Sequence, residues 1–185
     1  MILGLDISTS CTGWCIIDSA DSRLLKIGFI DLSKEKQFLS KADIVRESLI
    51  VLLESHDIKD IFIEENLQAF RPGFSSAKTL MTLARFNGIV SYICKRDLCI
   101  EPQFINVNIA RKVLGLKLDR KSKLSTKEQV FEWVDSKVDT EWPVKVLKSG
   151  PRKGLSIMSP NCYDMADAYV IASAGYNITK ESEKI

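Results

Sequence analysis

The sequence has little of what zinc and disulfide proteins need. Among its 185 residues there are five cysteines, none of them in a C-x-x-C pair, and a single histidine, His56. Because structural zinc sites use closely spaced cysteine and histidine ligands, this spacing argues against zinc. Without a sign of secretion, we expect the cysteines to be reduced and the protein to be cytoplasmic.

Long hydrophobic runs are also missing. No apolar stretch reaches the roughly 18 residues of a membrane-spanning helix, so we expect no membrane contact. The N-terminus has no basic segment, and Asp6 interrupts its first apolar stretch, which is not typical of a secretory signal. If the source is a virus, the expected compartment is the host cytoplasm.

The chain lacks a strong excess of either charge, since its net charge is only +2. The charge is unevenly spread, however, because residues 111–153 hold twelve Lys and Arg against six Asp and Glu. Such a basic segment can bind a polyanion, although a solvated helical surface has the same composition. Charge alone leaves both interpretations open.

Hydrophobic periodicity predicts an α/β protein. Strand candidates at 2–7, 13–18 and 24–32 have the short connections of an antiparallel meander. Strand and helix patterns then alternate, with strands at 59–64 and 102–107 and helices at 41–56, 76–95, up to 114 and 125–137. The stretch 143–158, which contains Pro and Gly, is expected to be a loop.

This order of elements predicts a mixed five-stranded sheet with helices on both faces. The meander is joined by two parallel strands, and we expect the strands at 2–7, 59–64 and 102–107 to be central. Their nearly continuous apolar composition is typical of strands that helices cover on both sides.

No internal repeat, low-complexity segment or interdomain linker divides the sequence. The length suits a single domain with its own core, which we expect over 1–177, followed by a polar tail at 178–185. The last helix is expected over 162–176, because Gly175 and Asn177 are typical of a helix end.

Four acidic residues occur where an unpaired charge is unfavourable. Asp6 and Glu64 end strand candidates of apolar composition. Asp164 and Asp167 lie three residues apart in an apolar helix and therefore share one of its faces. Each acid alone has an ordinary structural explanation, such as a turn cap or an ion pair. Together they are typical of an oxygen-ligand site for Mg²⁺ or Mn²⁺.

Such a cluster of carboxylates can hydrolyse a phosphodiester bond. Two divalent ions about 3.5–4 Å apart activate a water molecule and stabilise the leaving oxygen. Without metal the carboxylates repel one another, so we expect some of their pKa values to rise. Glu65 stays an alternative to Glu64, because a strand buried on both faces does not indicate which side chain faces the other acids.

Three segments, ILGLDISTSCTGW, IFIEENLQAF and YDMADAYVIA, occur in this order and span nearly the whole chain. They resemble the first strand and turn, the strand of the second acid and the closing D-x-x-D-A helix of RuvC-type Holliday junction resolvases, especially viral ones. The resemblance implies a ribonuclease-H-like fold and a homodimeric, metal-dependent endonuclease that cuts Holliday junctions and other branched DNA. It implies two ions, Mg²⁺ or Mn²⁺, held by Asp6, Glu64, Asp164 and Asp167.

The resemblance also implies roles for basic and aromatic residues. It offers Lys127, in STKEQV, as a cation that stabilises the transition state. RuvC-type enzymes carry an aromatic wedge shortly after the second acid, where this chain has Leu67. Phe70 and Phe74 lie nearby and can stack on bases, or pack into the core or a dimer contact. The expected DNA contacts are Phe70, Arg71, Phe74, Arg111, Lys112, Lys117, Arg120, Lys121 and Lys123. The helix at 76–96 is the expected dimer element, with the alternative that its apolar positions all belong to the core.

Other functions stay open. GLDISTSCTG also resembles the first phosphate loop of sugar kinases and actin-like ATPases, but those proteins need two such domains. A non-catalytic DNA-junction binding module would leave the four acids without a role. A ribonuclease that acts on RNA–DNA hybrids would share the metal chemistry but prefer a 2′-hydroxyl.

Overall fold

The computed structural model describes residues 1–65 and 76–182. Five strands form one sheet in the order β3-β2-β1-β4-β5. The antiparallel meander consists of β1 (Ile2–Ile7), β2 (Cys11–Ile17) and β3 (Leu24–Asp31). The sheet continues in parallel from β1 to β4 (Asp60–Glu64) and from β4 to β5 (Gln103–Ile105). The predicted mixed sheet is therefore confirmed.

The position of β5 differs from the expectation. The structure places this strand at the edge of the sheet, with only three residues, whereas its composition suggested a central strand. Phe104 is 51% exposed, and among the described strands β5 pairs only with β4. The central strand is β1, which pairs with β2 on one side and with β4 on the other.

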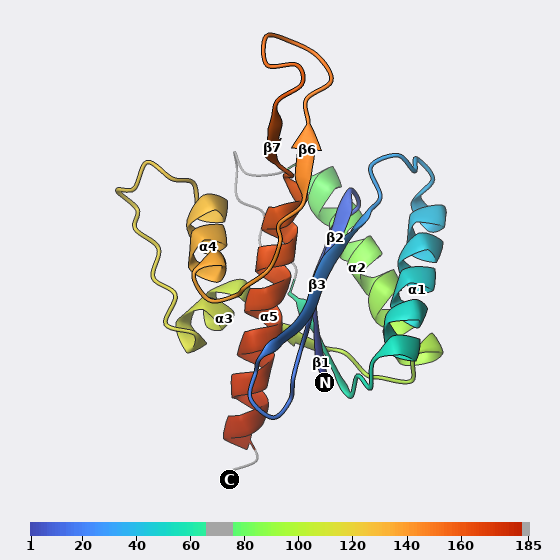
Figure 1. Ribbon diagram of the computed structural model, residues 1–185. Helices are drawn as coiled ribbons and strands as arrows, with labels where there is room; N and C mark the ends of the chain where they lie inside the picture. The colour runs from blue at the N-terminus through green and yellow to red at the C-terminus, as the bar shows by residue number, and fades with distance from the viewer. Residues whose placement is uncertain (66–75, 183–185) are drawn as a thin grey trace.

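Helices cover both faces of the sheet, as predicted (Figure 1). One face packs against α1 (Phe38–Ser55) and α2 (Ala77–Asp97). The other packs against α5 (Asn161–Ser182), flanked by α3 (Val107–Val113) and α4 (Thr126–Asp135). Ser76 caps α2 by accepting a hydrogen bond from the backbone N–H of Thr79. None of the helices in the described part of the chain has the length and apolar composition needed to cross a bilayer.

Helix α5 is longer than the sequence indicates. It continues to Ser182, so the prediction of an end near 176 is wrong, and 178–182 are helical. Gly175 has a packing role instead, because a β-carbon at this position would lie 2.3 Å from the ring of Phe62. The glycine lets the helix approach β4 closely and does not terminate it.

The segment 143–158, predicted as a loop, contains a β-hairpin. β6 (Val144–Val146) pairs antiparallel with β7 (Ser156–Met158). Gly150 and Gly154 have positive φ angles in the connection between them. The glycines thus belong to the turn of a hairpin. Figure 1 shows that this hairpin projects from the body of the molecule, beyond the start of α5.

Candidate active site

The side chain of Asp6 lies on the α5 face of the sheet, at the end of the central strand. Leu3 and Leu5 of β1 belong to the core beneath α1 and α2. Because side chains alternate along a strand, Gly4 and Asp6 face the opposite side. Gly4 confirms this orientation, since a β-carbon there would lie 2.4 Å from the carbonyl oxygen of Ala168 in α5.

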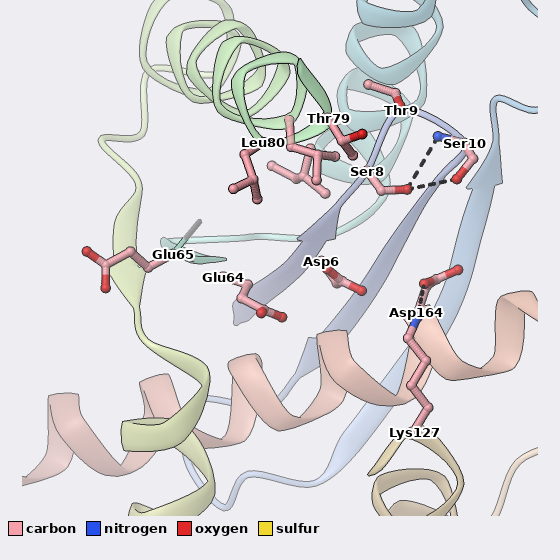
Figure 2. Close-up of a pocket in the computed structure, with 12 residues that line it drawn as sticks. Asp6, Ser8, Thr9, Ser10, Glu64, Glu65, Thr79, Leu80, Lys127 and Asp164 are labelled. Carbon is pink, nitrogen blue, oxygen red and sulfur yellow. Dashed lines mark hydrogen bonds and ion pairs between the residues drawn. The ribbon is translucent and has the colours of Figure 1, made fainter. Parts of the chain in front are cut away.

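The same alternation places Glu64 beside Asp6. Phe62 of β4 packs against Gly175 of α5, and Glu64 lies two residues further along the strand, on the same face. Figure 2 shows the carboxylates of Asp6 and Glu64 close together, whereas the side chain of Glu65 points away from them. The geometry therefore favours Glu64 over Glu65 as the second acid, a choice that the sequence left open.

Helix α5 brings two further acids to this position because it crosses β2 at very short distance. Gly13 is the partner of Asp6 in the β1–β2 ladder. A β-carbon on Gly13 would lie 2.0 Å from the carbonyl oxygen of Asp164, so only glycine permits this approach. Asp164 stands in the first turn of α5, and Asp167, one turn further, is only 8% exposed.

The pKa values of these carboxyl groups reflect their proximity. Burial raises the pKa of Asp6 well above its usual value, and the charges of Glu64 and Asp167 raise it further. Burial and the charge of Asp167 raise the pKa of Glu64 to about 7. Burial is also the main cause that raises the pKa of Asp167 to about 6. Carboxylates that are desolvated together repel one another, as expected for this cluster without a cation.

Lys127 reaches the acids from the first turn of α4. Its Nζ lies 3.5 Å from Oδ1 of Asp164. Burial lowers the pKa of Lys127, but the nearby acids, Asp164 and Asp167 foremost, outweigh this effect and hold the pKa above its usual value. Ser125 and Glu128 form a capping box that defines where α4 begins. The lysine therefore stays protonated beside the acids.

The chemistry of this cluster fits a divalent cation. Oδ1 of Asp167 is buried, and no described residue forms a hydrogen bond with it. A cation would supply the positive charge that the desolvated carboxylates lack. Within residues 1–65 and 76–182, no three acidic, histidine or cysteine side chains form a closed ligand set as they stand. Binding would therefore require the carboxylates to rotate toward one another.

Asp6, Glu64 and Asp164 line a cavity of about 450 Å³ (Figure 2). Its other wall is formed by Thr79, Leu80 and Leu83 of α2, and the turn at 8–10 lies at one end. Ser8 holds this turn, since its Oγ accepts hydrogen bonds from the backbone N–H groups of Ser10 and Cys11. Sequence analysis recognised the turn but missed the α2 residues, because nothing in their composition marks them as facing a site.

Four of the predicted DNA-binding residues line a separate cavity of about 420 Å³, namely Arg111, Lys112, Lys117 and Arg120. Lys121 and Lys123 are exposed on the same loop. Gln129 of α4 braces this loop, because its side-chain amide donates hydrogen bonds to the carbonyl oxygens of Asp119 and Leu124. The basic loop is thus held in a defined shape although its charged side chains are solvated.

Arg111 also acts on the acids. Burial raises the pKa values of Glu64 and Asp167, and the charge of Arg111 counteracts this effect at both groups. Its Nε is buried and finds no hydrogen-bond partner among the residues that the structure describes. The structure therefore brings Arg111 near the site. The remaining predicted contacts, and the position expected for the wedge, lie outside the described residues: Phe70, Arg71, Phe74 and Leu67.

Comparison with known proteins finds relatives among the resolvases, while no family model matches the chain. The crossover junction endodeoxyribonuclease RuvC of Sulfurovum sp. (strain NBC37-1) is 24% identical over 148 residues, which cover 79% of this chain and 86% of the relative. RuvC of T. thermophilus in complex with a Holliday junction substrate has a TM-score of 0.63 at 14% identity, over 97% of this chain and 94% of that one. The chain has the fold of the RuvC-type resolvases. The yeast mitochondrial Holliday junction resolvase Ydc2 shares it, with a TM-score of 0.57 at 16% identity, over 99% of this chain and 80% of that one.

The RuvC-type fold agrees with the three motifs recognised in the sequence. The first motif forms β1, the following turn and the start of β2, the second includes the end of β4, and the third lies in α5. These are the three elements whose ends meet at the cavity of the acids. The resemblance predicted from the sequence is therefore confirmed at the level of the fold.

Proposed function

We propose that the protein is a metal-dependent endonuclease that cuts Holliday junctions and other branched DNA. The observation that carries this proposal is the convergence of acids from β1, β4 and α5 beside a protonated lysine at one cavity. The relatives support it, since one is named a crossover junction endodeoxyribonuclease and another was solved with a Holliday junction substrate.

In this proposal the residues that hold the metal are Asp6, Glu64, Asp164 and Asp167. When bound there, two Mg²⁺ ions, or Mn²⁺ in their place, would activate a water and stabilise the leaving oxygen in phosphodiester hydrolysis. Oδ1 of Asp167 is buried without a hydrogen-bond partner among the described residues, and the pKa values of Asp6 and Glu64 are raised; both observations support this ligand set.

The cations of the chain complement these acids. Lys127 holds a positive charge next to Asp164, where it stabilises the negative charge that develops on the scissile phosphate. Arg111 and the basic loop at 117–123 bind phosphates of the DNA backbone and orient the substrate. The acids thus perform the chemistry, while the surrounding basic residues bind and position the DNA.

We also infer that the protein acts as a homodimer, which allows two opposing strands of a four-way junction to be nicked symmetrically. Helix α2 is the proposed interface element. It exposes Met81 and Tyr92, whose exposed fractions are 67% and 63%. Large apolar side chains in such positions are typical of surfaces that a partner covers.

The experiment is a cleavage assay on a labelled four-way junction, a Y-fork and a linear duplex, in Mg²⁺, Mn²⁺ or EDTA. We expect paired nicks in the four-way junction with either metal and none in EDTA. Asp6→Asn should reduce the cleavage rate by about 1,000-fold or more, while junction binding is retained. Asp139→Asn is the matched control, because Asp139 is exposed and lies beyond the far end of α4.

The outcomes separate the candidate functions. Cutting of forks and junctions alike would indicate a general debranching nuclease. Binding without cutting in any metal would favour the non-catalytic module. Near wild-type cutting by Asp6→Asn would exclude the proposed set of acids.

A further inference from the structure

The β6–β7 hairpin is strongly basic, and the proposed function does not yet use it. Residues 143–160 contain no acidic residue, and their four basic side chains are exposed: Lys145, Lys148, Arg152 and Lys153. Within the described residues, none of the four takes part in an ion pair. Like charges gathered on a projecting arm repel one another, so an anionic partner would relieve this repulsion.

A groove connects the base of the hairpin to the acids. A cavity of about 590 Å³ is lined by Lys145 of β6 on one side and by Asp164 and Lys127 on the other. It shares Ser10, Lys127 and Asp164 with the cavity that contains Asp6 and Glu64. A nucleic-acid strand with its phosphate at the acids can therefore continue along this groove toward the hairpin.

The base of the hairpin is held by hydrogen bonds and ring packing, and the rest of it projects from the body of the molecule. At the base, the backbone N–H of Ser159 donates to the carbonyl oxygen of Pro143 at 2.8 Å. Next to it, the indole N–H of Trp142 donates to Asp135 of α4 at 2.7 Å, and the Trp142 ring packs on Phe131. A short β-ribbon anchored in this way can lie along a groove of duplex DNA.

We propose that the β6–β7 hairpin is a DNA-binding arm, which contacts the phosphate backbone of the duplex arm that leaves the acids along this groove. This inference rests on the proposed function. Basic side chains on a projecting ribbon bind phosphates independently of base sequence. Val144 and Val146 lie on one face of the ribbon and are 68% and 51% exposed, so that face can pack against the sugars of the same backbone.

The test compares two triple variants that each remove three positive charges. Lys148→Gln/Arg152→Gln/Lys153→Gln alters the hairpin, and Lys26→Gln/Lys59→Gln/Lys137→Gln alters three exposed lysines on β3, before β4 and after α4. Binding of a labelled four-way junction is measured in EDTA from 50 to 200 mM salt. Each lost phosphate contact should reduce the slope of log Kd against log salt by about 0.9. Between 50 and 200 mM salt, the Kd of the hairpin variant should therefore rise about 4-fold less than that of wild type if one phosphate contact is lost. If three contacts are lost, it should rise about 40-fold less.

The outcomes distinguish this inference from the proposed function. Weaker binding and a smaller salt slope in the hairpin variant alone would support the DNA-binding arm. If both variants bind the junction with the same Kd and salt slope while the wild type cuts it, the hairpin is not a DNA-binding arm, and the proposed nuclease function is unaffected. A hairpin variant that becomes monomeric in sedimentation while its salt slope is unchanged would also overturn it, and would assign the hairpin to a contact between copies. Failure of the wild type to bind or cut the junction would contradict the proposed function itself.

Discussion

The helices on the two faces of the sheet contribute side chains of different size to the core. Against α1 and α2 the core consists of large residues, including Leu5, Leu49, Ile63 and Phe86. Against α5 the helix contributes small residues, with alanines at 166, 168, 172 and 174. On the first face side chains set the spacing between helix and sheet, whereas on the second the backbones of α5 and β2 nearly touch at Gly13.

Because of this difference, we expect one face mainly to determine the stability of the fold and the other mainly to determine the positions of the acids. Asp164 and Asp167 belong to the helix that lies directly on the sheet, so any change in that spacing moves them relative to Asp6. The face beneath α1 and α2 lies on the other side of the sheet and carries none of the four acids. We therefore expect an added methyl group on the α5 face to reduce activity, and a removed one on the opposite face to reduce stability.

The largest effect is expected for Gly13→Ala. The new β-carbon would lie 2.0 Å from the carbonyl oxygen of Asp164, so α5 must move away from β2. A displacement of about 1 Å in a catalytic group can lower the rate about 100-fold, and overpacking typically destabilises by about 1–3 kcal/mol. Single-turnover cleavage of a four-way junction in Mg²⁺ and urea unfolding measure the two effects.

Gly88→Ala is the control for this variant once sedimentation shows that its oligomeric state is that of wild type, because it adds the same methyl group to a helix where no described residue beyond the helix's own backbone lies within 4 Å. A cleavage rate within about 3-fold of wild type in Gly13→Ala would mean that this contact does not set the position of Asp164.

The opposite pattern is expected for Leu49→Ala, on α1. Leu49 is fully buried in the core of large residues, so truncation leaves a cavity and lowers the free energy of unfolding by about 2–5 kcal/mol. At a temperature where the variant stays folded, its cleavage rate should match wild type. The midpoint of urea unfolding and the single-turnover rate are measured together. A large loss of cleavage rate with little loss of stability would contradict the expectation that the α1 and α2 face determines stability rather than the positions of the acids.

Features of the fold that depend on local sequence were predicted, whereas features that depend on the packing of α5 against the sheet were not. Apolar runs that end in Asp6 and Glu64 are local signals, and they were sufficient to predict these two strands and the mixed sheet. The choice of Glu64 over Glu65 needed the face on which α5 packs, which is a contact between distant segments. Gly175 looks the same in sequence whether it ends a helix or lies against Phe62.

The β6–β7 hairpin escaped prediction for a related reason. Its strands have three residues each, too few for a period-2 pattern to stand out, and the glycines between them resemble those of an irregular loop. Its pairing depends on register across the turn at 147–155, which composition does not reveal.

A smaller effect is expected from the charge on the α5 side. The folded state raises the pKa of Glu64 from 4.5 to about 7 and that of Asp167 from 3.8 to about 6. The folded state therefore holds these protons more tightly than the unfolded chain. Their stabilising contribution is complete below about pH 4 and is lost as pH rises through 6 to 7, by on the order of 3 kcal/mol for Glu64 alone.

Urea unfolding from pH 4 to 8 in EDTA measures this loss, and Glu64→Gln isolates it, because the variant lacks the titrating group. In EDTA, the free energy of unfolding should fall more with rising pH in wild type than in the variant. In Mg²⁺ this fall in wild type should become smaller, because the cation favours the ionised carboxylates. A difference that is constant across this range would contradict the raised pKa of Glu64.

The smallest effect, and the one of opposite sign, is expected for Gly88→Ala as a variant in its own right. Gly88 is exposed on α2, and apart from the helix's own backbone an added β-carbon meets no atom of the described residues within 4 Å. Because glycine weakens a helix interior relative to alanine, the substitution should raise the free energy of unfolding by roughly 0.5–1 kcal/mol and leave cleavage unchanged. The same added methyl group is therefore expected to stabilise the fold at Gly88, where no backbone of the described residues lies opposite, and to displace α5 at Gly13, where the backbone of Asp164 is in the way. Urea unfolding and sedimentation are measured together, because α2 is also the proposed dimer element. A variant that is destabilised and loses its dimer would show that a second copy packs against α2 at Gly88, as closely as α5 packs against Gly13.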